Sequence, residues 1–244
     1  MDSGYYAAFS ALLARTEALD SAASNLANAN TNGFRAEREY FRSAIMGPHA
    51  LESQLNTTVN DFGVLGGNQL DLGQGALAHT GNPLDVAIEG GGFFKIQTQQ
   101  GIRYTRDGSF ERAANGTLTT RQGEPVLNLA AKPILIPAGP LSIGTDGLVS
   151  VAGAVVGQLG VVTFPSAQSL APEGTNRYTA PPGQETPARG YSLHEGSLEA
   201  SNQDVVAGTL QLVLVQRQAE MMQKALSIFH SDFDKTASEE LPKV

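Results

Sequence analysis

The sequence predicts an α+β fold: N- and C-terminal helices pair into an α-helical, coiled-coil-like layer, and a mostly antiparallel β domain is inserted between them. Near both ends of the chain, apolar and small residues recur at alternating steps of three and four, the spacing of a narrow helical seam. Between the ends the period changes to two, which is typical of strands. The N-terminal seam consists of Phe9, Leu12, Thr16, Leu19, Ala23 and Leu26, and the C-terminal seam of Gly208, Leu212, Val215, Ala219, Met222, Leu226 and Phe229.

These patterns divide the chain into four parts. Residues 1–35 and 198–244 form a discontinuous helical assembly domain, and residues 36–75 an extended connector. Residues 76–165 form the β domain, and residues 166–197 a Pro-rich return loop. Prolines around and within this loop argue against interior strand or helix there.

The first helix is expected to begin at Asp2 or Ser3, either of which can cap it. It ends near Asn28, where a run of Asn and Gly tolerates the left-handed turn that terminates helices. Asn is a poor helix former. We therefore expect Asn25 and Asn28, which lie inside the helix, to make side-chain contacts.

The β domain is marked by alternation and by turn dipeptides. Leu84, Val86 and Ile88 alternate with polar or small residues. The triplet 90–92 is interpreted as a turn between strands, because no Lys-Ser/Thr follows it as in a phosphate loop. Hairpin turns are expected at Asp107-Gly108, Asn115-Gly116 and Asp146-Gly147, and further strands at 117–120, 134–136, 148–151 and 155–164.

The last helix carries more apolar surface than one seam requires. Ser201 is expected to cap it, with Asp204 completing a capping box, and the tail after Phe229 is expected to fray. Small and polar residues weaken both seams, and a stripe widened by a second row needs more than one partner. We infer that the helices gain stability from neighbouring subunits in a polymer. The second row consists of Leu210, Leu214, Met221 and Ile228.

Composition excludes several classes of protein. The 244 residues are 41% hydrophobic and 16% charged, as in a globular chain. A net charge of −8 argues against nucleic acid and anionic membranes as main partners. No apolar run reaches the roughly 18 residues of a spanning helix. The N-terminus lacks the pattern of a signal peptide, so the default location is the cytoplasm.

No residue pattern points to catalysis. The chain has no cysteine, and its four histidines, His49, His79, His194 and His230, are scattered, so a zinc or iron site is not expected. Ser109 lacks the Gly-x-Ser-x-Gly elbow of hydrolases. We predict a protein that is not an enzyme and needs no cofactor or metal.

Three motifs carry a resemblance to a known family. Residues 23–35 (ASNLANANTNGFR), 83–94 (PLDVAIEGGGFF) and 104–110 (YTRDGSF) closely resemble, in order, signatures of the bacterial flagellar rod and hook proteins. Ala219 departs from the pattern, since the family usually has an aromatic residue there. Gln203 is a second departure, at a position where the family often has Val. Similarity near the C-terminus rests on Glu199, Ser201-Asn202, Gln216-Arg217, Glu220 and Lys224.

The resemblance implies a structural subunit of the flagellar basal-body rod. Such a subunit polymerises through its terminal helices into a hollow axial drive shaft that transmits torque and passes exported flagellar proteins. Implied partners are copies of itself, other rod and hook proteins, and the flagellar export apparatus, without nucleic acid or membrane insertion. The implied location is the periplasm-spanning basal body, reached by type III flagellar export without a cleavable signal peptide, in place of the cytoplasm. The length suits a rod subunit, and the Met1-Asp2 start and the short connector resemble proximal-rod members, with distal-rod members the close rivals.

Subunit contacts are expected along both helices. The alternative is a soluble β-domain binding module dimerised by its terminal helices, which would form a discrete oligomer and bind a small ligand. The expected interface residues are Tyr5, Phe9, Leu12, Leu19, Asn25, Leu26, Asn28, Val205, Leu212, Val215, Met222, Leu226 and Phe229.

Overall fold

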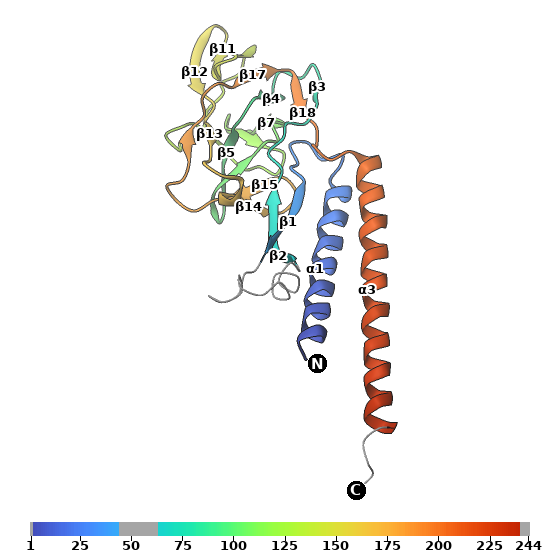
Figure 1. Ribbon diagram of the computed structural model, residues 1–244. Coiled ribbons are helices and arrows are strands. Elements are labelled where there is room, and N and C mark those ends of the chain that lie inside the picture. Colours follow the sequence, from blue (N-terminus) through green and yellow to red (C-terminus); the bar gives the residue numbers. More distant parts are fainter. Residues whose placement is uncertain (1, 44–62, 240–244) are drawn as a thin grey trace. The chain divides into compact units, whose positions relative to one another are not determined.

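The computed structural model describes residues 2–43 and 63–239, which form two long helices and many short strands (Figure 1). Two compact units are present. Unit 1 comprises Met1–Leu26, Glu37–Gln69 and Val205–Val244. Unit 2 comprises Ala27–Ala36 and Leu70–Asp204. A mostly antiparallel β region between two terminal helices confirms the expected α+β class, whereas coiled-coil-like pairing of the helices stays a prediction.

Helix α1 runs from Asp2 to Ala27, close to the predicted bounds. Its most buried residues form one face of small side chains, which at about 3.6 residues per turn lies on the side of the helix roughly opposite the expected seam. In the seam itself Leu12, Leu19 and Leu26 are half-buried, while Phe9 is 44% exposed. The buried face consists of Ala14, Ala18, Ser21, Ala22 and Asn25.

Helix α3 runs from Val205 to Glu239 and therefore continues ten residues past Phe229, where fraying was expected. The added segment contains no Pro or Gly, so no residue in it breaks the helix. Its least exposed positions coincide with the predicted seam, from Gly208 through Val215 and Ala219 to Leu226. Ser201 lies before the helix and accepts a hydrogen bond from the Gln203 N–H at 3.1 Å, so it shapes the turn that leads to α3.

Unit 1 also contains most of a two-stranded sheet. Its strands are β1 (Glu37–Ser43) and β2 (Gly63–Leu70). They lie where an extended connector was expected. The intervening part of that connector, 44–62, falls outside the described residues.

The strands of unit 2 are short, and every pairing recorded among them is antiparallel. They are β3 (Leu77–His79), β4 (Val86–Glu89), β5 (Phe93–Thr98), β6 (Gly101–Thr105), β7 (Phe110–Arg112), β8 (Leu118–Thr120), β9 (Val126–Leu127), β10 (Leu141–Ile143), β11 (Leu148–Val151), β12 (Ala154–Gln158), β13 (Val161–Thr163), β14 (Ala171–Glu173), β15 (Arg177–Thr179), β16 (Thr186–Pro187), β17 (Ser192–Glu195) and β18 (Ser197–Glu199).

The largest sheet follows the order β14-β15-β6-β5-β13-β16, and β9 also pairs with β5. A three-stranded sheet has the order β10-β11-β12. Three two-stranded ladders complete unit 2: β17 with β4, β18 with β3, and β7 with β8. The last two strands of the unit therefore return to pair with its first two.

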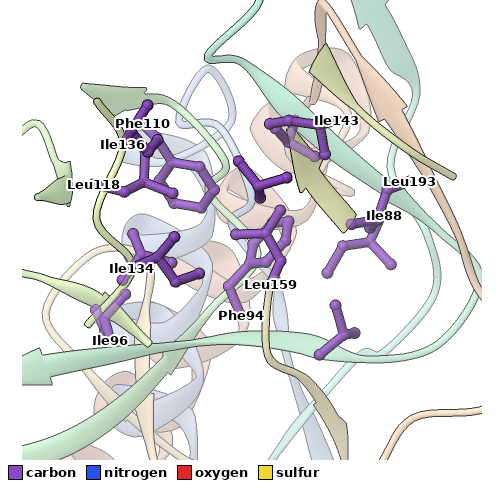
Figure 2. Close-up of a cluster of buried hydrophobic side chains, with 14 of the residues drawn as sticks. Ile88, Phe94, Ile96, Phe110, Leu118, Ile134, Ile136, Ile143, Leu159 and Leu193 are labelled. Atoms are coloured by element: carbon purple, nitrogen blue, oxygen red, sulfur yellow. The ribbon is translucent and has the colours of Figure 1, made fainter. Parts of the chain in front are cut away.

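Two buried hydrophobic clusters stabilise unit 2. The larger is drawn in Figure 2 and combines residues from β4, β5, β7, β8, β9, β10, β11, β13 and β17. Within it the rings of Phe94 and Phe110 meet edge to face, with centroids 5.1 Å apart. The smaller cluster lies around Phe93, Tyr104 and Tyr178.

Several local expectations are confirmed and others are wrong. Asn115-Gly116 joins β7 to β8 and Asp146-Gly147 joins β10 to β11, as expected, with Gly at positive φ in both. Asp107-Gly108 is not a hairpin turn, because β6 pairs with β5 and β15 and not with β7. A Cβ on Gly108 would lie 1.8 Å from the Val86 carbonyl oxygen, so this glycine serves close packing.

The Pro-rich segment is not only a loop. It contains β14, β15, β16 and β17, and β15 is an interior strand of the largest sheet. The three residues of β15, Arg177–Thr179, contain no proline, so each keeps the backbone N–H that an interior strand needs on both edges of the ladder. The structure also assigns residues 198–204 to unit 2, in contrast to the boundary expected from the helical pattern.

Candidate functional site

A buried ion cluster inside unit 2 joins the first and third motifs of the sequence to the region of C-terminal similarity. Arg35 ends the first motif, Arg106 lies in the third, and Glu199 comes from the C-terminal similarity. The Arg35 Nη2 lies 2.6 Å from Glu199 Oε1, and Arg106 Nη1 lies 3.3 Å from Glu199 Oε2. The three side chains are at most 3% exposed. We call these three residues the Arg–Glu–Arg cluster.

Glu199 is held at the end of β18 by contacts on both its side chain and its backbone. Its Oε1 also accepts a hydrogen bond from the Gly75 N–H at 2.8 Å. Its carbonyl accepts one from the Gly33 N–H, also at 2.8 Å. Glycine at position 75 lets its backbone lie close to residues 199 and 200, because a Cβ there would lie 2.0 Å from the Ala200 carbonyl oxygen.

Arg106 follows β6 and is fixed mainly by backbone acceptors. Its Nη1 donates to the Ile88 carbonyl at 3.1 Å and its Nη2 to the Gly90 carbonyl at 2.5 Å. The guanidinium carbon lies 5.6 Å from the centroid of the Phe93 ring, a cation–π distance. Burial lowers the pKa of Arg106 to about 10, against the opposing effect of the Glu199 carboxylate. Arg106 is therefore still a cation at neutral pH.

The segment that leads out of α1 is bound to the same place. The Arg35 N–H donates to the Tyr178 hydroxyl at 2.9 Å. Asn202 Oδ1 accepts from the Ala36 N–H at 2.7 Å, and its Nδ2 donates to the Asp71 carbonyl at 2.8 Å. Residues 33–36 and 199–202, the two connections to the helices, are thus bonded to each other within unit 2.

This arrangement suits a structural role. Two buried cations share one carboxylate, and among the described residues no hydrogen-bond acceptor reaches Arg35 Nε, Arg35 Nη1 or Arg106 Nε. A buried cluster of this kind costs desolvation energy and adds little net stability, whereas removal of one partner is expensive. Nothing in the cluster supplies a nucleophile. In the described part of the chain, no group of three or more His, Asp or Glu residues could hold a metal ion.

Comparison with known proteins supports the motif assignment. Residues 6–35 match the family described as "Flagella basal body rod protein", and residues 87–151 match "Flagellar hook protein FlgE/F/G D1 domain". The "Flagellar basal-body rod protein FlgF" of Caulobacter vibrioides is 35% identical over 253 aligned positions that span all of both chains. The chain belongs to the flagellar basal-body rod protein family.

Other relatives in the rod protein family carry two names. The FlgF of Mesorhizobium japonicum is 34% identical over 90% of each chain. The FlgG of Bacillus subtilis is 35% identical over 82% of this chain and 84% of its own. Full-length alignment with a FlgF makes this rod protein FlgF-like.

The family matches locate the cluster within the rod protein. Arg35 is the last residue of the first matched range, and Arg106 lies in the second. Glu199 lies in neither range, and 164 positions separate it from Arg35. The family resemblance included all three residues, two in motifs and Glu199 near the C-terminus, but no spacing in the sequence indicates that their side chains meet.

The residues expected at subunit interfaces occupy varied positions in this rod protein. Leu12, Leu19, Leu26, Asn28, Leu212, Met222 and Leu226 are half-buried, Asn25 and Val215 are buried, and Phe9 and Val205 are exposed. Tyr5 lies in α1 and Phe229 in α3, and their side chains fall outside the described part of the chain. The structure holds a single chain, so their role in assembly stays a prediction. In the described residues, no helix is long and apolar enough to span a membrane.

Proposed function

We propose that this chain polymerises through its terminal helices, with copies of itself and with other rod and hook proteins, into the hollow axial rod of the flagellar basal body. The rod would cross the periplasm, transmit torque, and pass flagellar proteins delivered by the export apparatus. The subunit itself would leave the cell through that apparatus without a cleavable signal peptide. Its role would be structural, with no enzymatic step.

The observation that carries this proposal is the apolar surface of α3. Its second row remains open: Leu210 and Met221 are each 62% exposed, Ile228 60% and Leu214 56%. Complete burial of a large apolar side chain contributes about 1.5–3 kcal/mol, so contact with neighbouring subunits would stabilise this row. A rod in which each helix touches several others supplies such neighbours.

Substitution on the seams tests the proposal. Leu19→Asp in α1 and Leu212→Asp in α3 place a carboxylate on half-buried faces, where desolvation of the charge opposes close packing. We expect loss of rod assembly and of swimming, while the β domain retains its thermal transition. Gln218→Asp, at an exposed position of α3, is the matched control and should assemble normally. Normal swimming of the Leu19→Asp or Leu212→Asp strain would contradict the proposal.

A further inference from the structure

Residues 192–202, here called the C-terminal clasp, hold the beginning of unit 2 in place. Within the clasp, β17 pairs with β4 and β18 pairs with β3. The Ala200 N–H donates to the Ala76 carbonyl at 2.8 Å, and the Thr80 N–H donates to the Gly196 carbonyl at 2.7 Å. Every one of these contacts joins the clasp to a segment more than a hundred positions earlier in the chain.

The early segments depend on the clasp for their pairing. In the described chain, β3 pairs with no strand other than β18, and β4 with none other than β17. Leu193 of the clasp is 1% exposed and belongs to the larger buried cluster with Ile88 of β4. Without the clasp, these strands would lack both ladder partners and part of their core.

The buried charges impose the same dependence more strongly. Glu199 is the carboxylate that lies against both Arg35 and Arg106. Burying two guanidinium groups with their shared anion absent leaves uncompensated charge in a low-dielectric interior, which is strongly unfavourable. The segment around Arg35 therefore cannot settle onto Arg106 before Glu199 arrives.

We propose that docking of the C-terminal clasp is the step that orders the N-terminal part of unit 2, with Glu199 as the residue that triggers it. Residues 33–36, 71–80 and 85–89 stay open until residues 192–202 are present, while the sheet around β5 and β9 forms independently. The unit thus closes only when nearly its whole length is available. This inference concerns the folding of unit 2 itself and does not depend on assembly into a rod.

Pulsed hydrogen exchange during refolding of the full chain tests this order. Two reporter amides make bonds that do not involve the clasp: Arg35 N–H to the Tyr178 hydroxyl, and Asp71 N–H to the Ala36 carbonyl. We expect them to gain protection in the same kinetic phase as the clasp amides of Gly196 and Ala200. The Gln97 N–H, bonded to the Pro125 carbonyl, should gain protection earlier. Protection of Arg35 and Asp71 before Gly196 and Ala200 would overturn the proposal.

A charge-removing variant sharpens the test. Glu199→Gln keeps the shape of the side chain but removes its charge, so the late phase should slow about tenfold while the Gln97 phase is unchanged. The matched control is Glu173→Gln, which breaks a more exposed pair with Arg103 and should leave both phases unchanged. Adding Arg35→Met to Glu199→Gln removes one unpaired cation and should restore part of the rate. An unaltered late phase in Glu199→Gln, or no recovery in the double variant, would overturn the role of the charge. If Glu199→Gln does not fold, the order measured in the unmodified chain still decides the proposal.

Discussion

Asn25 of α1 makes both backbone hydrogen bonds of Glu37, the first residue of β1. Its Oδ1 accepts from the Glu37 N–H at 2.9 Å, and its Nδ2 donates to the Glu37 carbonyl at 2.8 Å. The amide side chain thus substitutes for a neighbouring strand and joins helix to sheet within unit 1. This explains why a poor helix former occupies a buried helical position. Because the contact lies within the chain, a role of Asn25 at a subunit interface stays a prediction.

Replacing Asn25 should weaken unit 1. In Asn25→Asp the side chain has no N–H group to donate to the Glu37 carbonyl and places a carboxylate beside it. We expect the free energy of unfolding to fall by about 1–3 kcal/mol, because a buried acceptor loses its partner. Urea unfolding and hydrogen exchange at the Glu37 amide would measure the change. Asn30→Asp, the same substitution at an exposed position, is the control, and an equal loss there would refute the explanation.

Close backbone packing at Gly75 offers a second test. A Cβ at Gly75 would lie 2.0 Å from the Ala200 carbonyl oxygen, whereas a Cβ at Gly91 would meet no atom within 4 Å. Neither residue has positive φ, so the pair isolates packing from backbone strain. Gly75→Ala should lower the free energy of unfolding by about 1–3 kcal/mol, as overpacking does. Gly91→Ala should be neutral or slightly stabilising in the same denaturant titration, and equal effects would contradict the packing argument.

Local patterns predicted local elements well. The alternation from Leu84 to Ile88 located β4, and Asn-Gly and Asp-Gly dipeptides located two hairpins, because strand period and turn chemistry are encoded by neighbouring residues. The failure at Asp107-Gly108 is non-local. Asp107-Gly108 has turn composition but packs against the Val86 carbonyl, a partner that no nearby residue reveals.

The candidate site was visible only as separate motif residues. Arg35, Arg106 and Glu199 each lie in a region of family resemblance, yet their meeting depends on strand pairings that span most of the chain. Composition did not predict strand β15 either. The prolines around it argue against strand, and only three residues, Arg177–Thr179, pair with the sheet. Which strands pair over long distances in the sequence depends on packing throughout the core. Local patterns in a single sequence therefore do not predict it.

A third prediction concerns pH and the group formed by Lys95, Tyr104 and Glu185. Lys95, only 2% exposed, binds Glu185 at 2.7 Å, and the Tyr104 hydroxyl donates to the same carboxylate. Burial alone would raise the pKa of Glu185, but the hydrogen bonds from Lys95 and Tyr104 outweigh it and hold the pKa below 4.5. Burial also raises the pKa of Tyr104 above its usual 10.0, and the bond to Glu185 adds to the effect.

The signs of these shifts fix two pH windows. The lowered Glu185 pKa adds stability above the unfolded value of 4.5, and that stability disappears as pH falls through the folded value. The raised Tyr104 pKa adds stability below 10.0, which is lost as pH rises above it. Urea unfolding should therefore show Glu185→Gln less stable than the unmodified chain at pH 6, with the difference shrinking by pH 3. A stability difference between Glu185→Gln and the unmodified chain that stays constant from pH 6 to pH 3 would disprove this contribution of Glu185.

Limited proteolysis of the dilute monomer, read by mass spectrometry, separates the rod subunit from the binding module. Unit 2 contains both buried clusters, whereas α3 exposes an apolar row along much of its length. We expect rapid cleavage within 3–26 and 205–239 and survival of a fragment within 70–204, because cleavage follows local opening where few apolar contacts are buried. Raising the protein concentration should then protect the helices as neighbouring subunits cover them. Helices that resist cleavage in a discrete dimer, at a concentration where no polymer forms, would instead favour a binding module that dimerises through its ends.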